Sequence, residues 1–173
     1  MKKNLFLIVC SLIIFTSCKT TFTAADRATL TKGGISCKQV QFYNDKPIEL
    51  KREVSLADFK TVSGKVQIEN GKHYEYIYFP KHTNAMCISD DKESYLVISF
   101  EEGASLVFWM NEDGTYFRIG DENTKKLADG GPVTYDKKKY TVTTGHDAIL
   151  LFQNNVRFKE SKERRIVKGR KIH

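Results

Sequence analysis

The chain has 173 residues, of which 40% are hydrophobic and 28% charged, and its formal net charge is +7. This composition excludes an intrinsically disordered or collagen-like chain and is typical of one globular domain. Three Pro and 11 Gly residues also exclude a low-complexity chain. The 12% of aromatic residues supply apolar material for a hydrophobic core.

The N-terminus has the pattern of a secretory signal. Lys2 and Lys3 precede an apolar run over residues 5–15, and small residues follow at 16–17. A basic start, ~7–15 apolar residues and a small-residue cleavage site define such a signal. The run is shorter than the ~20 residues that a transmembrane helix needs. We therefore expect residues 1–17 to be a signal peptide that is removed.

Cys18 directly follows this leader. The sequence Phe15-Thr16-Ser17-Cys18 resembles a bacterial lipobox, the cleavage site of a lipoprotein signal peptide, although Phe15 replaces the usual Leu. The resemblance implies that Cys18 becomes the acylated first residue, and the loose form of the motif is similar to that of small Bacteroidota envelope lipoproteins. Acyl chains hold a protein on a membrane because each buried methylene contributes ~0.8 kcal/mol.

The same resemblance implies a location in the cell envelope, lipid-anchored to the bacterial outer membrane. Residues 19–22 include no acidic residue after Cys18. Surface-exported lipoproteins of such bacteria often carry acidic residues there, so the resemblance favours the periplasmic face over the cell surface. We expect contact with membrane lipid through the acylated Cys18, and in addition with either an envelope protein partner or an anionic surface. Nucleic acid is not expected for a lipidated envelope protein.

The rest of the chain divides into three expected parts: a lipidated Cys and tether at 18–35, an all-β domain at 36–155 and a basic C-terminal tail at 156–173. The tether is expected because residues 19–34 show little periodicity, and Gly33 and Gly34 end any helical turn before them.

From residue 36 onward the pattern is that of strands separated by turns. Asn70-Gly71 predicts a tight hairpin, and the turn cluster at 44–47 predicts another between runs at 40–42 and 48–54. Turns recur every ~8–12 residues, as in sandwiches and barrels, and no segment has the 3.6 period of a helical layer. We predict an all-β fold, an antiparallel meander of about ten strands forming a sandwich or small barrel with little helix.

Two cysteines remain after the leader and Cys18: Cys37 and Cys87. An even pair in an oxidising compartment favours a disulfide. Such a bond closes a loop of about 50 residues and contributes ~2–4 kcal/mol. The alternative is two small, buried, apolar side chains. We predict the Cys37–Cys87 disulfide.

Aromatic residues form one candidate binding constellation. Tyr74, Tyr76 and Tyr78 alternate along a predicted strand and therefore share one face, and Trp109 lies on a neighbouring hairpin. Core packing is the default role of such residues, whereas exposed Tyr and Trp anchor partners. Both roles are compatible with the pattern, so we name these four residues as candidate partner contacts.

The tail at 156–173 carries the excess positive charge of the chain. It contains eight basic and two acidic residues, whereas residues 18–155 contain 18 basic and 19 acidic residues. Such an end is either a solvated tail or an electrostatic contact to anionic lipid, a polyanion or an acidic partner. The candidate partner contacts in it are Arg157, Lys159, Arg164, Arg165, Lys168, Arg170 and Lys171.

The sequence contains no recognisable catalytic or metal motif. It has no phosphate loop, no Gly-x-Ser-x-Gly elbow, no His-Glu-x-x-His and no Cys-x-x-Cys. We therefore expect no enzymatic activity, cofactor or metal, and favour a lipid-anchored binding or accessory (scaffold) subunit of a membrane-associated complex. The alternative is a lipocalin-like β-barrel that binds a small apolar ligand. An envelope hydrolase is the least supported class.

Overall fold

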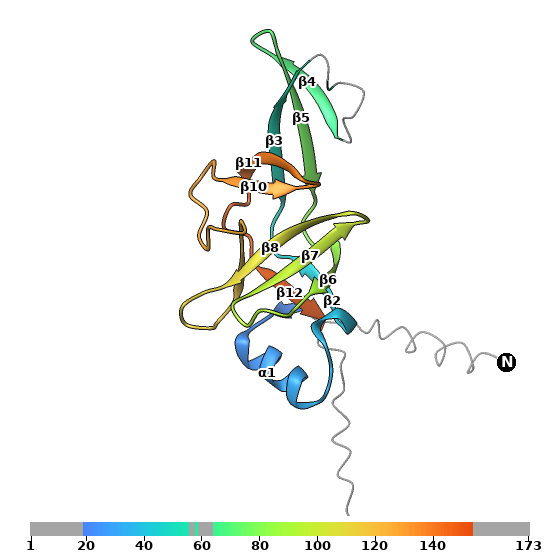
Figure 1. Ribbon diagram of the computed structural model, residues 1–173, viewed down its shortest axis with the longest axis vertical. Helices are drawn as coiled ribbons and strands as arrows, with labels where there is room; N and C mark the ends of the chain where they lie inside the picture. Colours follow the sequence, from blue (N-terminus) through green and yellow to red (C-terminus); the bar gives the residue numbers. More distant parts are fainter. Residues whose placement is uncertain (1–18, 56–57, 59–63, 154–173) are drawn as a thin grey trace, which may run out of the picture.

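The computed structural model describes residues 19–55, 58 and 64–153. Within these residues, twelve strands form two antiparallel sheets, accompanied by one α-helix and one short 3-10 helix. The sheets pack in a sandwich-like arrangement and do not close into a barrel (Figure 1). The all-β prediction is confirmed, whereas the closed barrel that the lipocalin-like alternative requires is not formed by the described strands. No helix in these ranges is long and apolar enough to cross a membrane.

The first sheet has the strand order β1-β12-β2-β6-β7-β8-β9. Its strands are β1 Lys19–Thr21, β2 Gln41–Asn44, β6 Asn84–Ser89, β7 Tyr95–Glu101, β8 Ala104–Met110, β9 Phe117–Gly120 and β12 Leu150–Gln153. The second sheet has the order β10-β11-β3-β5-β4. Its strands are β3 Ile48–Val54, β4 Lys65–Glu69, β5 Lys72–Phe79, β10 Pro132–Tyr135 and β11 Lys138–Thr144. The helices are α1 Ala24–Lys32 and the 3-10 helix η2 Cys37–Gln39.

The expected meander is realised in β6 to β9, which follow one another both along the chain and across the sheet. Two later strands instead pair with strands near the start of the domain. β12 lies between β1 and β2, and β11 pairs with β3. These long-range pairings close the domain around its core.

The hairpin at Asn70-Gly71 is confirmed. β4 and β5 pair in register as far as Glu69 and Lys72. Asn70 and Gly71 have positive φ angles of 50° and 78°, as a type I′ turn requires at both central positions.

The hairpin predicted at 44–47 is wrong, because β2 and β3 belong to different sheets. Asn44 shapes this corner. Its buried side-chain amide donates hydrogen bonds to the backbone oxygens of Lys46 and Pro80, each at 2.8 Å. These bonds stabilise a turn that carries the chain from one sheet to the other.

The tether predicted at 18–35 is wrong for the residues from 19 onward. β1 pairs with β12, and Phe22 directly after it is completely buried. Thr23 caps α1, which buries Leu30. No periodic signal marks this segment, because two isolated apolar side chains are too few to make one.

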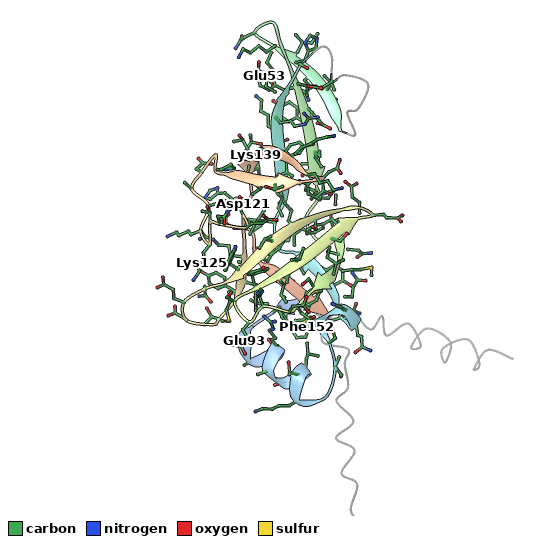
Figure 2. The ribbon with its side chains drawn as sticks, in the orientation of Figure 1. Glu53, Glu93, Asp121, Lys125, Lys139 and Phe152 are labelled. Atoms are coloured by element: carbon green, nitrogen blue, oxygen red, sulfur yellow. The ribbon has the colours of Figure 1, made fainter. Side chains whose placement is uncertain are left out.

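The core lies between the two sheets and extends to α1. Phe22 is at the centre of an aromatic cluster, with ring centroids 5.0 Å from Phe42, 5.4 Å from Phe117 and 5.1 Å from Phe152. Figure 2 shows Phe152 at the end of the molecule where α1 lies. The largest completely buried side chains include Tyr135, Tyr140, Phe22, Phe42, Phe108 and Phe117.

Strands β3, β5 and β4 form an arm whose far end projects beyond the rest of the domain (Figure 1). Figure 2 shows Glu53 near this far end. Lys19, the first described residue, pairs with Gln153, the last one. Lys19 belongs to β1 and Gln153 to β12, and these two strands lie toward the end of the molecule opposite the arm (Figure 1). The two ends of the described chain therefore lie together, and the arm points away from them.

Candidate functional site

The three tyrosines of β5 share one face of the arm, which we call the tyrosine face. Tyr74 and Tyr76 are half-buried and Tyr78 is 57% exposed, so none of them belongs to the core. The opposite face of the same strand carries Glu75 and Phe79, which are buried. Core packing, one of the two roles considered for these tyrosines, is therefore not theirs, and their role as partner contacts stays a prediction.

Charged side chains from neighbouring strands flank the tyrosines. Lys51 of β3 lies over the Tyr74 ring, with its Nζ 4.1 Å from the centroid, and forms an ion pair of 2.6 Å with Glu69 of β4. A second ion pair, between Lys72 and Glu53, measures 2.9 Å. Exposed pairs of this kind add little to stability. Glu69 of the first pair also accepts a hydrogen bond from the Tyr76 hydroxyl.

A buried charge network supports the arm from its other face. Glu75 is completely buried and accepts hydrogen bonds from Arg52 Nε at 2.5 Å, from the Gly64 backbone N–H at 2.9 Å and from the Tyr140 hydroxyl at 3.1 Å. Burial raises the pKa of Tyr140 to about 12, so the phenol stays protonated and donates. The network connects β3, β5, β11 and the residue before β4.

Trp109 is not brought together with the tyrosines. It lies on β8 in the other sheet, where its ring is 4.7 Å from that of Tyr95 and its Nε1–H donates to the backbone oxygen of Asp121 at 2.8 Å. A Cβ on Gly120 would lie 2.4 Å from the indole ring. Glycine at this position therefore leaves the room that Trp109 occupies.

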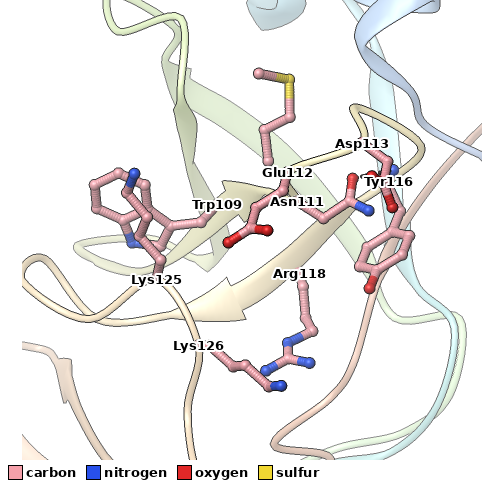
Figure 3. A pocket seen from close by; sticks show the side chains of 9 residues that line it. Trp109, Asn111, Glu112, Asp113, Tyr116, Arg118, Lys125 and Lys126 are labelled. Atoms are coloured by element: carbon pink, nitrogen blue, oxygen red, sulfur yellow. Dashed lines mark hydrogen bonds between the residues drawn. The ribbon is translucent and has the colours of Figure 1, made fainter.

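Trp109 lines a pocket of about 260 Å³ beside β8 and β9 (Figure 3). The other lining residues were not predicted from the sequence: Met110, Asn111, Glu112, Asp113, Tyr116, Arg118, Lys125 and Lys126. The adjacent lysines Lys125 and Lys126 were the one feature of the sequence that could have indicated a site here. Their approach to Arg118 depends on how the loop after β9 folds back.

Cys37 and Cys87 are free thiols in the structure, so the predicted disulfide is not formed there. Both side chains are buried in the hydrophobic cluster, Cys37 from η2 and Cys87 from β6. They therefore pack as small apolar residues, which was the alternative role considered for them.

We expect these thiols to resist alkylation by iodoacetamide at pH 8 in the folded protein and to react after unfolding in urea. Burial raises the pKa of Cys37 to about 11 and that of Cys87 to about 12, and the thiolate is the reactive form. Between pH 9, where the thiols of the unfolded chain titrate, and pH 11, the folded state keeps protons that the unfolded chain has lost. The free energy of unfolding must therefore fall as the pH rises through this range.

Mass spectrometry of the alkylated protein checks this expectation. Rapid labelling of the folded protein would contradict the burial of the thiols. A chain that takes up label in urea only after a reductant is added contains the Cys37–Cys87 disulfide.

Cys18 and the seven candidate residues of the basic tail, Arg157 to Lys171, lie outside the described residues. Acylation and tail contacts therefore stay predictions.

Across the described ranges, no group of three or more His, Cys, Asp and Glu side chains is placed to hold a metal ion. Comparison of the chain with protein-family models, curated proteins and solved structures found no match.

Proposed function

We propose that this protein is a lipid-anchored cell-envelope binding protein, an accessory or scaffold subunit that docks an envelope protein partner on its tyrosine face. The observation that carries the proposal is the position of this face. It lies on an arm that projects away from Lys19 and Gln153, where the chain continues to Cys18 and to the basic tail (Figure 1).

This arrangement supports an anchor at one end and docking at the other. Because Lys19 already belongs to β1, an acyl chain on Cys18 would hold the first sheet directly against the bilayer. The basic tail would continue from Gln153 beside it, where its charge adds to binding of anionic lipid. On the proposed periplasmic face of the outer membrane, the arm would then reach a partner beyond the lipid surface.

The composition of the tyrosine face favours a protein over a polyanion as its partner. Tyrosine gives a large amphipathic contact at low cost in conformational entropy, and such residues often dominate binding energy. On β3, β4 and β5, the lysines and glutamates that share this face by strand register are equal in number: Lys51, Lys65, Lys72, Glu49, Glu53 and Glu69. Lys139 on the adjacent strand β11 lies on the same side. A polyanion would therefore meet at most a slight excess of positive charge here.

The proposal predicts that the double substitution Tyr74→Ser/Tyr78→Ser lowers recovery of the partner at least tenfold. The full chain, expressed with its leader, is extracted in mild detergent and its co-purifying proteins are quantified. The matched control is Met86→Ser/Ile88→Ser on β6, which removes side chains that are 60% and 48% exposed from another surface. We expect the control to retain the partner, because it leaves the tyrosine face intact.

Urea denaturation of both variants separates loss of docking from loss of fold, since their midpoints should be equal. Cys18→Ala tests the anchor and should move the protein to the soluble fraction. Truncation after Asn155 measures the contribution of the tail. Equal recovery with the tyrosine and β6 variants, or the absence of a stoichiometric partner of the unaltered chain, would refute the docking proposal.

A further inference from the structure

The pocket beside Trp109 gathers three cations that the docking proposal does not use: Arg118, Lys125 and Lys126 (Figure 3). Arg118 on β9 is in register with Trp109 on β8. Its Nη2 is buried without a hydrogen-bond partner. In the part of the chain that the structure describes, the side chains of all three lack an ion pair or a hydrogen bond, and Lys125 Nζ lies 5.6 Å from the centre of the Trp109 ring.

Three unpaired cations around one pocket favour an oxyanion as ligand. A guanidinium group presents two parallel N–H donors that match the oxygens of a phosphate or carboxylate. Figure 3 shows the charged ends of Arg118 and Lys126 directed toward one another, so one anion between them would reduce their mutual repulsion. A phosphate group offers these three cations more acceptor oxygens than the two of a carboxylate, which favours phosphate.

The opposite side of the pocket limits what is attached to that phosphate. Glu112 and Asp113 line it from the loop between β8 and β9. Their carboxylates repel a bare anion but accept hydrogen bonds from hydroxyl groups. Trp109 and Tyr116 add aromatic surface for a carbon skeleton. The volume of about 260 Å³ is below the range of ~300–1,000 Å³ typical of drug-sized ligands.

We propose that this pocket binds a phosphate ester of a small polyhydroxylated molecule, with the phosphate on Arg118 and Lys126 and the hydroxyl groups toward Glu112. Binding requires no partner protein and no tyrosine face, so the site is a second one, separate from the docking function.

The test titrates the full chain in detergent with glycerol 3-phosphate, inorganic phosphate and glycerol by isothermal calorimetry. We expect saturable binding of glycerol 3-phosphate, at least tenfold weaker binding of inorganic phosphate and no binding of glycerol. Arg118→Gln and Lys126→Gln should each weaken binding of the ester at least tenfold. Lys139→Gln, which removes an exposed charge outside the pocket, should leave it unchanged.

Glu112→Gln tests whether the hydroxyl groups of the ligand lie toward Glu112. This variant should reduce the preference for the ester over inorganic phosphate. Lys126 is exposed, so its variant remains informative if Arg118→Gln fails to fold. Absence of saturable binding, equal affinity for the ester and inorganic phosphate, or binding that survives both cation variants overturns the proposal.

The ester has two potential sources, a lipid headgroup or a free molecule. Vesicles of phosphatidylglycerol added to the full chain with Cys18→Ala distinguish them. Competition between vesicles and glycerol 3-phosphate that is lost with Lys126→Gln assigns the pocket to a headgroup. Binding of glycerol 3-phosphate without such competition assigns it to a free ester. Either result upholds the proposed chemistry.

Discussion

Replacement of Phe22 by alanine should lower the free energy of unfolding by about 3–5 kcal/mol, the range of Phe→Ala changes in packed cores. The side chain is completely buried, and its ring lies within 5.0–5.4 Å of the ring centroids of Phe42, Phe117 and Phe152. Its removal leaves a cavity that these rings fill only by moving away from other contacts. Urea denaturation followed by fluorescence of Trp109, the single tryptophan, measures the loss.

Thr20→Ala is the matched control, because Thr20 lies on β1 two residues away and is exposed. Exposed substitutions usually change stability by less than ~0.5 kcal/mol. Equal stability of the two variants would mean that residues 19–22 do not pack on the domain. In that case the tether expected from the sequence would be correct and the position of β1 wrong.

The second large effect is expected for Glu75→Ala, which should cost about 3–5 kcal/mol, as is typical when one partner of a buried ion pair is removed. The substitution leaves the Arg52 guanidinium, only 14% exposed, without its carboxylate. It also removes the acceptor for the Tyr140 hydroxyl and for the Gly64 backbone N–H. Urea denaturation gives the total loss, and hydrogen exchange of β4 and β5 shows whether the arm opens first.

The double variant Arg52→Met/Glu75→Leu separates charge from packing. Replacement of a buried ion pair by apolar residues of similar volume is often neutral or stabilising. We therefore expect this variant to recover the part of the loss that comes from the uncompensated Arg52 charge, whereas the Tyr140 hydroxyl and the Gly64 N–H still lack their acceptor. A loss equal to that of Glu75→Ala would contradict the uncompensated charge as the cause. Glu53→Ala, in the exposed pair with Lys72 on the same arm, should have little effect.

The positions of most strands are determined by the sequence alone, because they depend on neighbouring residues. The alternation along β5 places Tyr74, Tyr76 and Tyr78 on one face, whichever strands lie beside it. The backbone preferences of Asn70-Gly71 place the turn between β4 and β5. Such signals are local and do not depend on the other sheet.

Sheet membership and burial were decided only by the tertiary structure. Phe22 and Leu30 become core residues because β12 pairs with β1 and brings the last strand to the first. The hairpin expected at 44–47 fails because the Asn44 amide bonds to Pro80, far along the chain. Arg118 and Lys126 line the same pocket through the fold of one loop. The first two results depend on contacts between residues distant in sequence and the third on the path of one loop, and local pattern carries no information about either.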